Sequence, residues 1–263
     1  LMTMINLRFY YFWRRNAMLR GTLLLQTKVT VLMTLLTVVI GMISFLVFEW
    51  DGTLQDRDGI WLKTVTSFFH SVNARSGGLN SVNLAEADTL TLCIMMMLMF
   101  IGGGSGSMAG GIKVTTFFVI VVAVYFVLRR REHIQIFERR IPPQLVHVAL
   151  MIGFLYTVGM ALGTFCVIGF ESEAVEQLKD KTNVILACQL EQGWLGIVFD
   201  CVSAFGTVGL STGVTPALTI DSKWVLMCMM FVGRILTLTL SVYLLRPWEK
   251  SYVKYPEEQI ALG

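Results

Sequence analysis

Charged residues are scarce in this chain. Asp, Glu, Lys and Arg make up 15% of its 263 residues, against about 25% in a typical globular domain. Hydrophobic residues make up 55% and gather in several uninterrupted stretches, each long enough to cross a bilayer. This composition excludes an ordinary soluble domain and predicts an integral membrane protein. The net charge of +3 is too small to indicate nucleic-acid binding.

Cysteine and histidine are few and widely spaced. The five cysteines are odd in number and lack metal-ligand spacing, which excludes a complete disulfide framework and favours small core residues. The three histidines form no pair at helical spacing, so we expect no resident metal. A nucleophile, a base and an oxyanion-binding group do not occur in a recognisable pattern. We therefore expect neither an enzyme nor a bound cofactor.

Three stretches have the roughly 20 apolar residues that a spanning helix needs, namely 28–48, 145–168 and 224–245. A fourth stretch, 89–128, would form a helix about 60 Å long, twice the hydrocarbon thickness of a bilayer. Six of the ten residues in 102–111 are glycine, so the helix must break there. Non-helical backbone at membrane depth is tolerated only where protein buries it or water lines it. The break therefore predicts an intramembrane cavity or pathway.

Basic residues indicate the orientation of the spans. Arg8, Arg14, Arg15 and Arg20 precede the first span without any acid, and five arginines between 129 and 140 follow the broken helix. Acids outnumber bases in the connections at the other ends of the spans. We therefore expect a multi-pass protein of the cell membrane, with both ends of this chain in the cytoplasm.

Two shorter apolar segments, 60–72 and 195–205, are too short to cross the membrane and are typical of re-entrant pore helices. The chain thus contains a span, a re-entrant helix, a polar loop and a span, followed by the same sequence of parts. Aligned at an offset of 131, the two loop regions match without a gap and place Gly78 on Gly209. This pattern indicates an internal repeat.

The predicted fold is an all-α integral membrane protein with tandem repeats of the M1, pore helix and M2 type found in potassium channels. The second helix of the first repeat is expected to be broken by a glycine-rich intramembrane loop. The predicted segments are an interfacial and cytoplasmic linker (1–26), a pore repeat (27–131), a cytoplasmic linker (132–144), a second pore repeat (145–246) and a cytoplasmic tail (247–263).

The loops after the two pore helices are the predicted selectivity filter. In potassium channels, carbonyl oxygens of a Thr-Val-Gly-type strand replace the hydration shell of the ion, and glycine is needed where the backbone takes conformations that a Cβ forbids. The first loop has an extra glycine, so we expect it to be more flexible and less strict against sodium. The alternative is an ordinary tight turn. The predicted ion ligands are the backbone oxygens of Ser76, Gly77, Gly78, Thr207, Val208 and Gly209.

An arginine in the middle of the last span points to a gate. Arg234 costs roughly 2.5–3.5 kcal/mol at the centre of a membrane helix unless it is bound, and at the repeat offset it aligns with Gly103. We hypothesise that it holds the carbonyls of the glycine break across the pore; the alternative is that it extends to the membrane interface. The predicted gate comprises Gly102, Gly103, Gly104, Ser105, Gly106, Gly110, Gly111, Lys113 and Arg234.

Two other basic side chains beside the predicted path have open roles. Lys113 either repels cations when the gate is shut or points to the cytoplasm. Arg75 precedes the first filter loop, where Gly206 is its counterpart. Its guanidinium either bonds loop carbonyls away from the axis or repels ions directly, and the first is favoured.

Three motifs together resemble a known family. The segments 74–80 (ARSGGLN), 100–113 (FIGGGSGSMAGGIK) and 203–213 (SAFGTVGLSTG) are similar to the third and fourth repeats of the membrane subunit of Ktr-type potassium transporters, in the Trk/Ktr/HKT family. The resemblance extends from about residue 23 to residue 248. It implies a chain of four repeats around one pore, a homodimer of such chains, and a cytosolic ring of nucleotide-binding regulatory subunits of the RCK (KtrA) type.

The resemblance also frames the expected function. Only two repeats are present and the first residue is Leu1, so we expect the C-terminal half of a longer chain that supplies the remaining two repeats. The transported ion would be potassium, with a leaning toward sodium-stimulated uptake through a pore embedded in membrane lipid. The alternatives are a poorly selective pathway for sodium and other monovalent cations, or a non-conducting membrane assembly module.

Overall fold

The computed structural model describes residues 25–55, 59–104, 107, 109–130, 135–136, 139–178 and 193–243, and most of them are helical. The helices are α2 (Leu25–Phe48), α3 (Ile60–Asn73), α4 (Thr89–Phe100), α5 (Val114–Leu128), α6 (Pro143–Leu178), α8 (Gly193–Phe205) and α9 (Ile220–Tyr243). Two single turns of 3-10 helix are η1 (Leu84–Glu86) and η2 (Thr215–Ala217). The predicted tail 247–263 lies outside the described residues, and so does nearly all of the predicted linker 1–26.

A small hairpin departs from the all-α prediction. Strands β1 (Gln135–Ile136) and β2 (Arg139–Arg140) pair antiparallel, with Gln135 opposite Arg140. They lie in the predicted linker 132–144, between α5 and α6. Backbone groups outside a helix still need hydrogen-bond partners, and the short pairing supplies them where the chain reverses direction.

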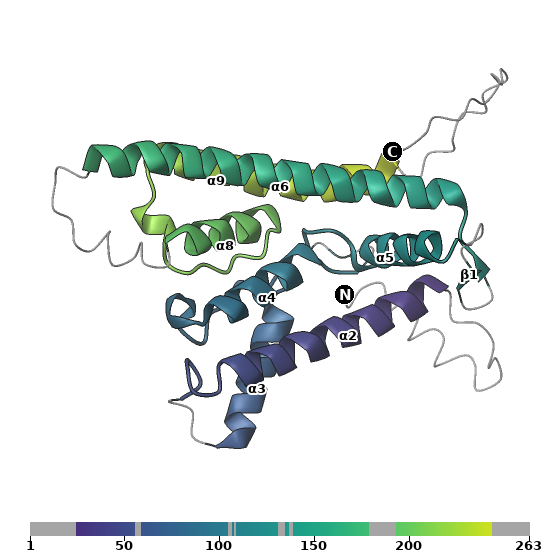
Figure 1. Ribbon diagram of the computed structural model, residues 1–263, viewed down its shortest axis with the longest axis horizontal. Coiled ribbons are helices and arrows are strands. Elements are labelled where there is room, and N and C mark those ends of the chain that lie inside the picture. The colour runs from purple at the N-terminus through teal and green to yellow at the C-terminus, as the bar shows by residue number, and fades with distance from the viewer. Residues whose placement is uncertain are drawn as a thin grey trace.

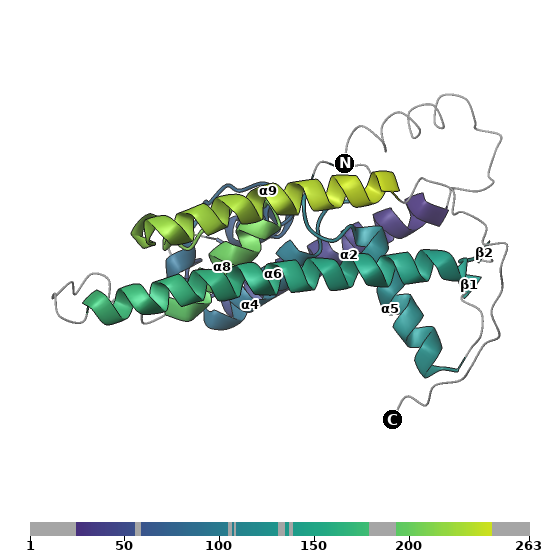
Figure 2. The same cartoon turned by 90° about the horizontal axis from the view of Figure 1, so that it is seen from above.

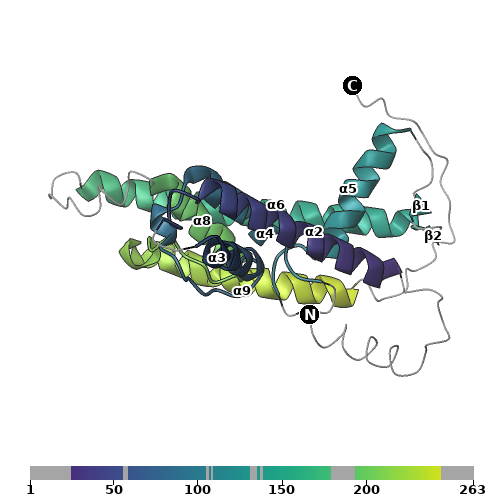
Figure 3. The same ribbon diagram turned by 90° about the horizontal axis from the view of Figure 1, so that it is seen from below.

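The two halves of the chain form two neighbouring groups of helices. In Figure 1, α6 and α9 lie side by side along one edge of the molecule, with α8 packed against both. Helix α2 runs near the opposite edge and packs against α3 and α4. Contacts between α4 and α8 and between α5 and α6 join the two groups. The last residues of the short helices α3 and α8 lie toward the middle of the molecule in Figure 1. Figure 2 shows α6 and α9 adjacent in the orthogonal view as well, and Figure 3 shows α3 nearly end-on.

Two helical stretches among the described residues are long and apolar enough to cross a membrane. They are Gln26–Phe48 and Pro143–Ser172. Large apolar side chains on both are exposed in the isolated chain; for example, Leu35 is 60% and Phe165 is 75% exposed. Such surfaces are costly in water and are expected on helices that face lipid.

The boundaries of several elements recur at the repeat offset. The starts of η1 and η2, at Leu84 and Thr215, are 131 positions apart, as are the starts of α4 and α9, at Thr89 and Ile220. The offset found in the loop residues therefore extends to whole elements. The repeats differ in one respect: α9 is continuous, whereas the matching stretch ends at Phe100 and resumes as α5 at Val114.

A glutamate at the end of the first long helix fixes the start of the second in each half. The Glu49 carboxylate accepts the backbone N–H of Asp88 at 2.8 Å, directly before α4. In the other half, Glu171 accepts the backbone N–H of Thr219 at 2.9 Å, directly before α9. The first N–H groups of a helix have no partner within the helix, so a carboxylate at this point is stabilising.

Close packing of α9 against the end of α8 depends on Gly233. A Cβ at Gly233 would lie 2.0 Å from the carbonyl oxygen of Phe205, the last residue of α8. The Phe205 ring is buried against Tyr156 of α6, with 4.7 Å between ring centroids. A glycine inside a helix costs about 1 kcal/mol relative to alanine. At position 233 the glycine is required because it allows α9 to approach the end of α8 this closely. This contact sets the distance between α9 and the loop that follows α8.

We expect Gly233→Ala to destabilise the detergent-solubilised protein by about 2 kcal/mol, because the new methyl group forces α9 away from Phe205. Gly169→Ala on α6 is the matched control, since a Cβ there meets nothing within 4 Å; it should be neutral or stabilising by up to about 1 kcal/mol. Thermal unfolding of both variants measures the difference. Equal melting temperatures would contradict the packing role of Gly233.

Candidate functional site

The loops that follow α3 and α8 meet at two glycines. A Cβ on Gly78 would lie 2.9 Å from the Val208 carbonyl oxygen and 3.3 Å from the Gly209 Cα, and a Cβ on Gly209 would lie 3.3 Å from the Gly78 Cα. The two backbones are therefore in direct contact, with no room for side chains between them. Both glycines have positive φ angles, 67° and 91°, which residues with a Cβ rarely adopt.

The two loops also share a pattern of backbone handedness. Positive φ occurs at Ser76 and Gly78 in the first loop and at Thr207 and Gly209 in the second, but not at the residues between them. The angles of the matched glycines are similar, 67° and 91°, whereas those of Ser76 and Thr207 differ, 148° and 51°. The two loops therefore share the positions of positive φ but not one conformation.

The first loop is held from behind by side chains of α3. The Asn73 amide donates to the Leu79 carbonyl, and the Leu79 N–H donates back to Asn73 Oδ1 at 3.2 Å. A Cβ on Gly77 would overlap this amide oxygen. The extra glycine that suggested a flexible loop therefore makes room for a side chain that fixes it. His70, also on α3, lies 2.8 Å from the Ser81 hydroxyl through Nε2.

The second loop is held by an acid that the sequence analysis did not single out. Asp200 of α8 is 4% exposed and accepts hydrogen bonds from residues just beyond Gly209, including the backbone N–H of Thr212 at 3.0 Å. The signal in the sequence was a single carboxylate inside the otherwise apolar segment 193–205.

The glycine break forms a closed loop. Its two ends lie side by side: the Gly102 N–H donates to the Ile112 carbonyl at 2.9 Å, and the Val114 N–H donates to the Gly103 carbonyl at 3.2 Å. Gly102 is needed at the crossing, because a Cβ there would lie 1.9 Å from the Gly110 carbonyl oxygen. Ser105 and Gly106, two of the predicted gate residues, lie outside the described residues.

The break touches the second filter loop directly. The Gly110 N–H donates to the Thr207 hydroxyl at 3.1 Å, and a Cβ on Gly110 would lie 2.4 Å from the Gly206 carbonyl oxygen. The predicted gate and the predicted filter are therefore adjacent in space, although 97 positions separate Gly110 from Thr207.

Lys113 and Arg75 each donate hydrogen bonds to backbone carbonyls, and their anticipated roles beside an ion path stay predictions. The Lys113 ammonium turns back onto the break and donates to the carbonyls of Ser107 at 2.8 Å and Ala109 at 2.7 Å. Arg75 is 7% exposed and donates to the Thr34 carbonyl of α2 at 3.0 Å, not to a loop carbonyl. Free helix and loop carbonyls attract buried cations because each unpaired polar group is costly.

Arg234 lies on α9 beside the same region. It lines a cavity of about 600 Å³ together with Asp200, Thr207 and Gly209. Its charge is near enough to Lys113 to act on it electrostatically. The hypothesis that its guanidinium holds carbonyls of the break remains a prediction.

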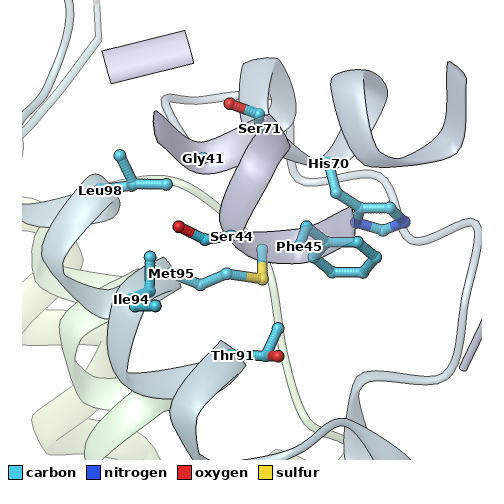
Figure 4. Close-up of a pocket in the computed structure, with 9 residues that line it drawn as sticks. All are labelled: Gly41, Ser44, Phe45, His70, Ser71, Thr91, Ile94, Met95 and Leu98. Atoms are coloured by element: carbon cyan, nitrogen blue, oxygen red, sulfur yellow. The ribbon is translucent and has the colours of Figure 1, made fainter. Parts of the chain in front are cut away.

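A second, much smaller cavity lies among α2, α3 and α4. Figure 4 shows Gly41 and Phe45 on one side, His70 and Ser71 on another, and Thr91 below. Its volume is about 10 Å³, the space of one water molecule, so it is too small for a ligand. Within the part of the chain that the structure describes, no group of three or more His, Cys, Asp or Glu residues is placed to hold a metal ion.

Comparison with known proteins places this geometry in a family. Residues 4–252 match the TrkH family model, described as cation transport protein. The chain is 32% identical over 244 residues to Ktr system potassium uptake protein B of Vibrio alginolyticus, and 33% identical over 247 residues to the protein of that name in Bacillus subtilis. These alignments cover 91% and 92% of the chain but 48% and 50% of the relatives.

Two further comparisons bear on function and fold. Potassium/sodium uptake protein NtpJ of Enterococcus hirae is 32% identical over 241 residues, which cover 91% of the chain and 50% of that protein. The crystal structure of the potassium transporter TrkH from Vibrio parahaemolyticus shares the fold, with a TM-score of 0.54 and 18% identity over 84% of this chain and 44% of that one. The chain thus spans about half the length of the curated relatives it matches. Because the family model covers nearly its whole length, the chain belongs to the TrkH family of cation transport proteins.

Proposed function

We propose that this chain is the C-terminal half of the pore-forming membrane subunit of a potassium uptake transporter. The observation that carries the proposal is the backbone contact between Gly78 and Gly209, because an ion path made of main-chain oxygens requires loops that meet without side chains between them. The printed names of the relatives, which are potassium uptake proteins, support the choice of ion. Their greater length supports a second half that supplies two more loops.

In the proposed mechanism, a potassium ion loses its water and is bound by carbonyl oxygens of the filter. The ligands in this chain are the backbone oxygens of Ser76, Gly77, Gly78, Thr207, Val208 and Gly209. The positive φ of Gly78 and Gly209 at matching positions supports an equivalent role for the two loops. One filter around one axis needs four such loops, so conduction requires the complete protein. The ion then moves down its electrochemical gradient, and this chain performs no bond-making chemistry.

The pore repeats follow from the same proposal. Helices α2, α3 and the broken pair α4 and α5 would form one M1, pore helix and M2 unit within 27–131, and α6, α8 and α9 would form the next within 145–246. The recurrence of element starts at the repeat offset supports this division. The protein would cross the cell membrane several times, with 1–26, 132–144 and 247–263 in the cytoplasm.

The glycine break is proposed as the gate below the filter. Its loop packs on Gly206 and Thr207, and its carbonyls are held by Lys113. Arg234, at the position equivalent to Gly103, would add a second cation on the other side of the loop. Releasing these contacts would let the loop leave the path.

Partners enter the proposal through the family resemblance. A homodimer of complete chains and a cytosolic ring of nucleotide-binding subunits would control the gate, with the ring docking on 129–140 and on the tail. A second candidate function is a poorly selective pathway that also conducts sodium. It is supported by one relative that is named for both potassium and sodium. A flux assay with potassium, rubidium and sodium, each with and without external sodium, separates selective uptake, sodium stimulation, a poorly selective pathway and a non-conducting module.

The filter proposal predicts that Gly78→Ala and Gly209→Ala in the complete protein each reduce potassium uptake at least about tenfold. The Cβ of either alanine would contact the other loop, and the alanine would have to adopt a positive φ that it disfavours. Growth of a potassium-uptake-deficient bacterium and radioactive rubidium uptake measure the loss. Gly59→Ala, before α3 and outside both loops, is the matched control, because its φ is also positive, 94°, but a Cβ there meets nothing within 4 Å. Equal losses in all three variants would refute a specific role of the loop contact.

The gate proposal predicts higher flux when the contacts of the break are removed. Lys113→Met, Arg234→Gln and deletion of 103–110 should each raise rubidium uptake, because each removes groups that would hold the break in the path. The loss of one charge-assisted hydrogen bond corresponds to a rise of about tenfold. Lys223→Met is the matched control, because Lys223 bonds a single carbonyl, that of Pro216 at 2.9 Å, outside the break. Unchanged flux in all three variants at normal membrane expression would remove the gate from the mechanism.

A further inference from the structure

A buried carboxylate lies behind the second filter loop. Asp200 is the eighth residue of α8 and is the only acid in that apolar helix. It is 4% exposed. Burial of a carboxylate is expensive unless hydrogen bonds replace its water, so its partners show what the side chain does.

Within the described residues, the Asp200 carboxylate accepts hydrogen bonds from the segment directly after Gly209. Oδ1 accepts the backbone N–H of Thr212 at 3.0 Å and its hydroxyl at 3.3 Å. Oδ2 accepts the hydroxyls of Ser211, at 2.9 Å, and Thr215. The Ser211 hydroxyl in turn accepts the N–H of Gly213 at 3.0 Å. One side chain therefore fixes the whole return of the loop onto α8.

The first loop has no equivalent. At the repeat offset, Asp200 corresponds to Phe69, whose ring cannot accept these hydrogen bonds, and Thr212 corresponds to Ser81, which pairs with the His70 ring at 2.8 Å. The Asn73 amide also holds the first loop, and Asn80 donates to the Ser211 carbonyl of the second loop at 3.2 Å. Hydrogen bonds to an ionised group are roughly twice as strong as neutral ones. The second loop thus differs from the first in having a carboxylate among its supports.

We propose that Asp200 is a positioning residue that sets the ion selectivity of the pathway by holding the loop from Thr207 to Thr215 in one shape. This inference rests on the proposed function. Asp200 does not touch the ion; it keeps the carbonyls of Thr207 and Val208 from following a smaller ion inward. Thr207 itself has a positive φ of 51°, and its backbone N–H donates to the Ala204 carbonyl of α8 at 3.0 Å.

The test uses the complete protein and the ratio of sodium to potassium uptake, which does not depend on expression level. Asp200→Asn removes the negative charge and places an amide NH₂ against the hydroxyls of Ser211 and Thr215, which must then accept instead of donate, so the charge-assisted hydrogen bonds are replaced by weaker neutral ones. We expect the ratio to rise about tenfold, as for the loss of one charge-assisted hydrogen bond. Thr215→Val keeps the side-chain shape and removes one donor from Oδ2, and should raise the ratio about threefold.

Glu171→Gln is the matched control. Glu171 also accepts from the N–H and the hydroxyl of one threonine, Thr219, both at 2.9 Å, but at the start of α9 and away from the loop. Its uptake ratio should equal that of the wild type. A rise in Asp200→Asn and Thr215→Val, but not in Glu171→Gln, supports the inference; if Asp200→Asn does not reach the membrane, Thr215→Val decides.

Two results would overturn the inference in distinguishable ways. The positioning role is refuted if the wild type takes up potassium but the ratio of sodium to potassium uptake is unchanged in Thr215→Val and in any correctly inserted Asp200→Asn. It is also refuted if the ratio rises equally in Glu171→Gln. Both results leave the proposed function intact. Absence of monovalent cation uptake by the complete wild-type protein refutes the proposed function itself.

Discussion

The contact between Gly78 and Gly209 is the constraint on which the rest of the arrangement depends. Two backbones approach this closely only when neither carries a side chain, and both glycines lie in loops that follow short helices, α3 in one group of the fold and α8 in the other. The packing of α4 on α8 brings the two loops together. Glu49 and Glu171 then fix the starts of α4 and α9 beside the ends of α2 and α6. The longer helices thus serve to aim two loops at one point.

The glycine break follows a related rule. Backbone that leaves the helix at membrane depth must find partners within the protein. Its ends pair with each other through Gly102 and Ile112, and its middle bonds Thr207 through Gly110. Lys113 satisfies two carbonyls of the loop from within. Because Thr207 belongs to the proposed filter loop, a movement of the break would change the environment of a proposed ion ligand.

Spacing along the chain was enough to predict the helices, the break and the equivalence of Gly78 with Gly209, because each of these is a local property of hydropathy or glycine content. Contacts that depend on which helices pack together were not predictable in the same way. No local pattern marks Gly233 as the contact point for Phe205, and none indicates that Lys113 bonds the carbonyls of Ser107 and Ala109. Asp200 was visible as an acid in an apolar segment, but its partners follow only from the turn of the loop.

The two halves of the chain keep the same sequence of elements and differ at matching positions. Where the first half breaks its helix around Gly103, the second continues α9 and carries Arg234; where the first has Phe69, the second has Asp200. At the position of the repeat where the first half has backbone carbonyls around Gly103, the second half has the cation of Arg234. The supports of the second loop include the carboxylate of Asp200, whereas those of the first loop include the neutral amide of Asn73. A pore with identical repeats would place four equal breaks around its axis, with no donor facing them. Under the proposed function, divergence between the repeats would let Arg234 of the continuous helix α9 hold the single break.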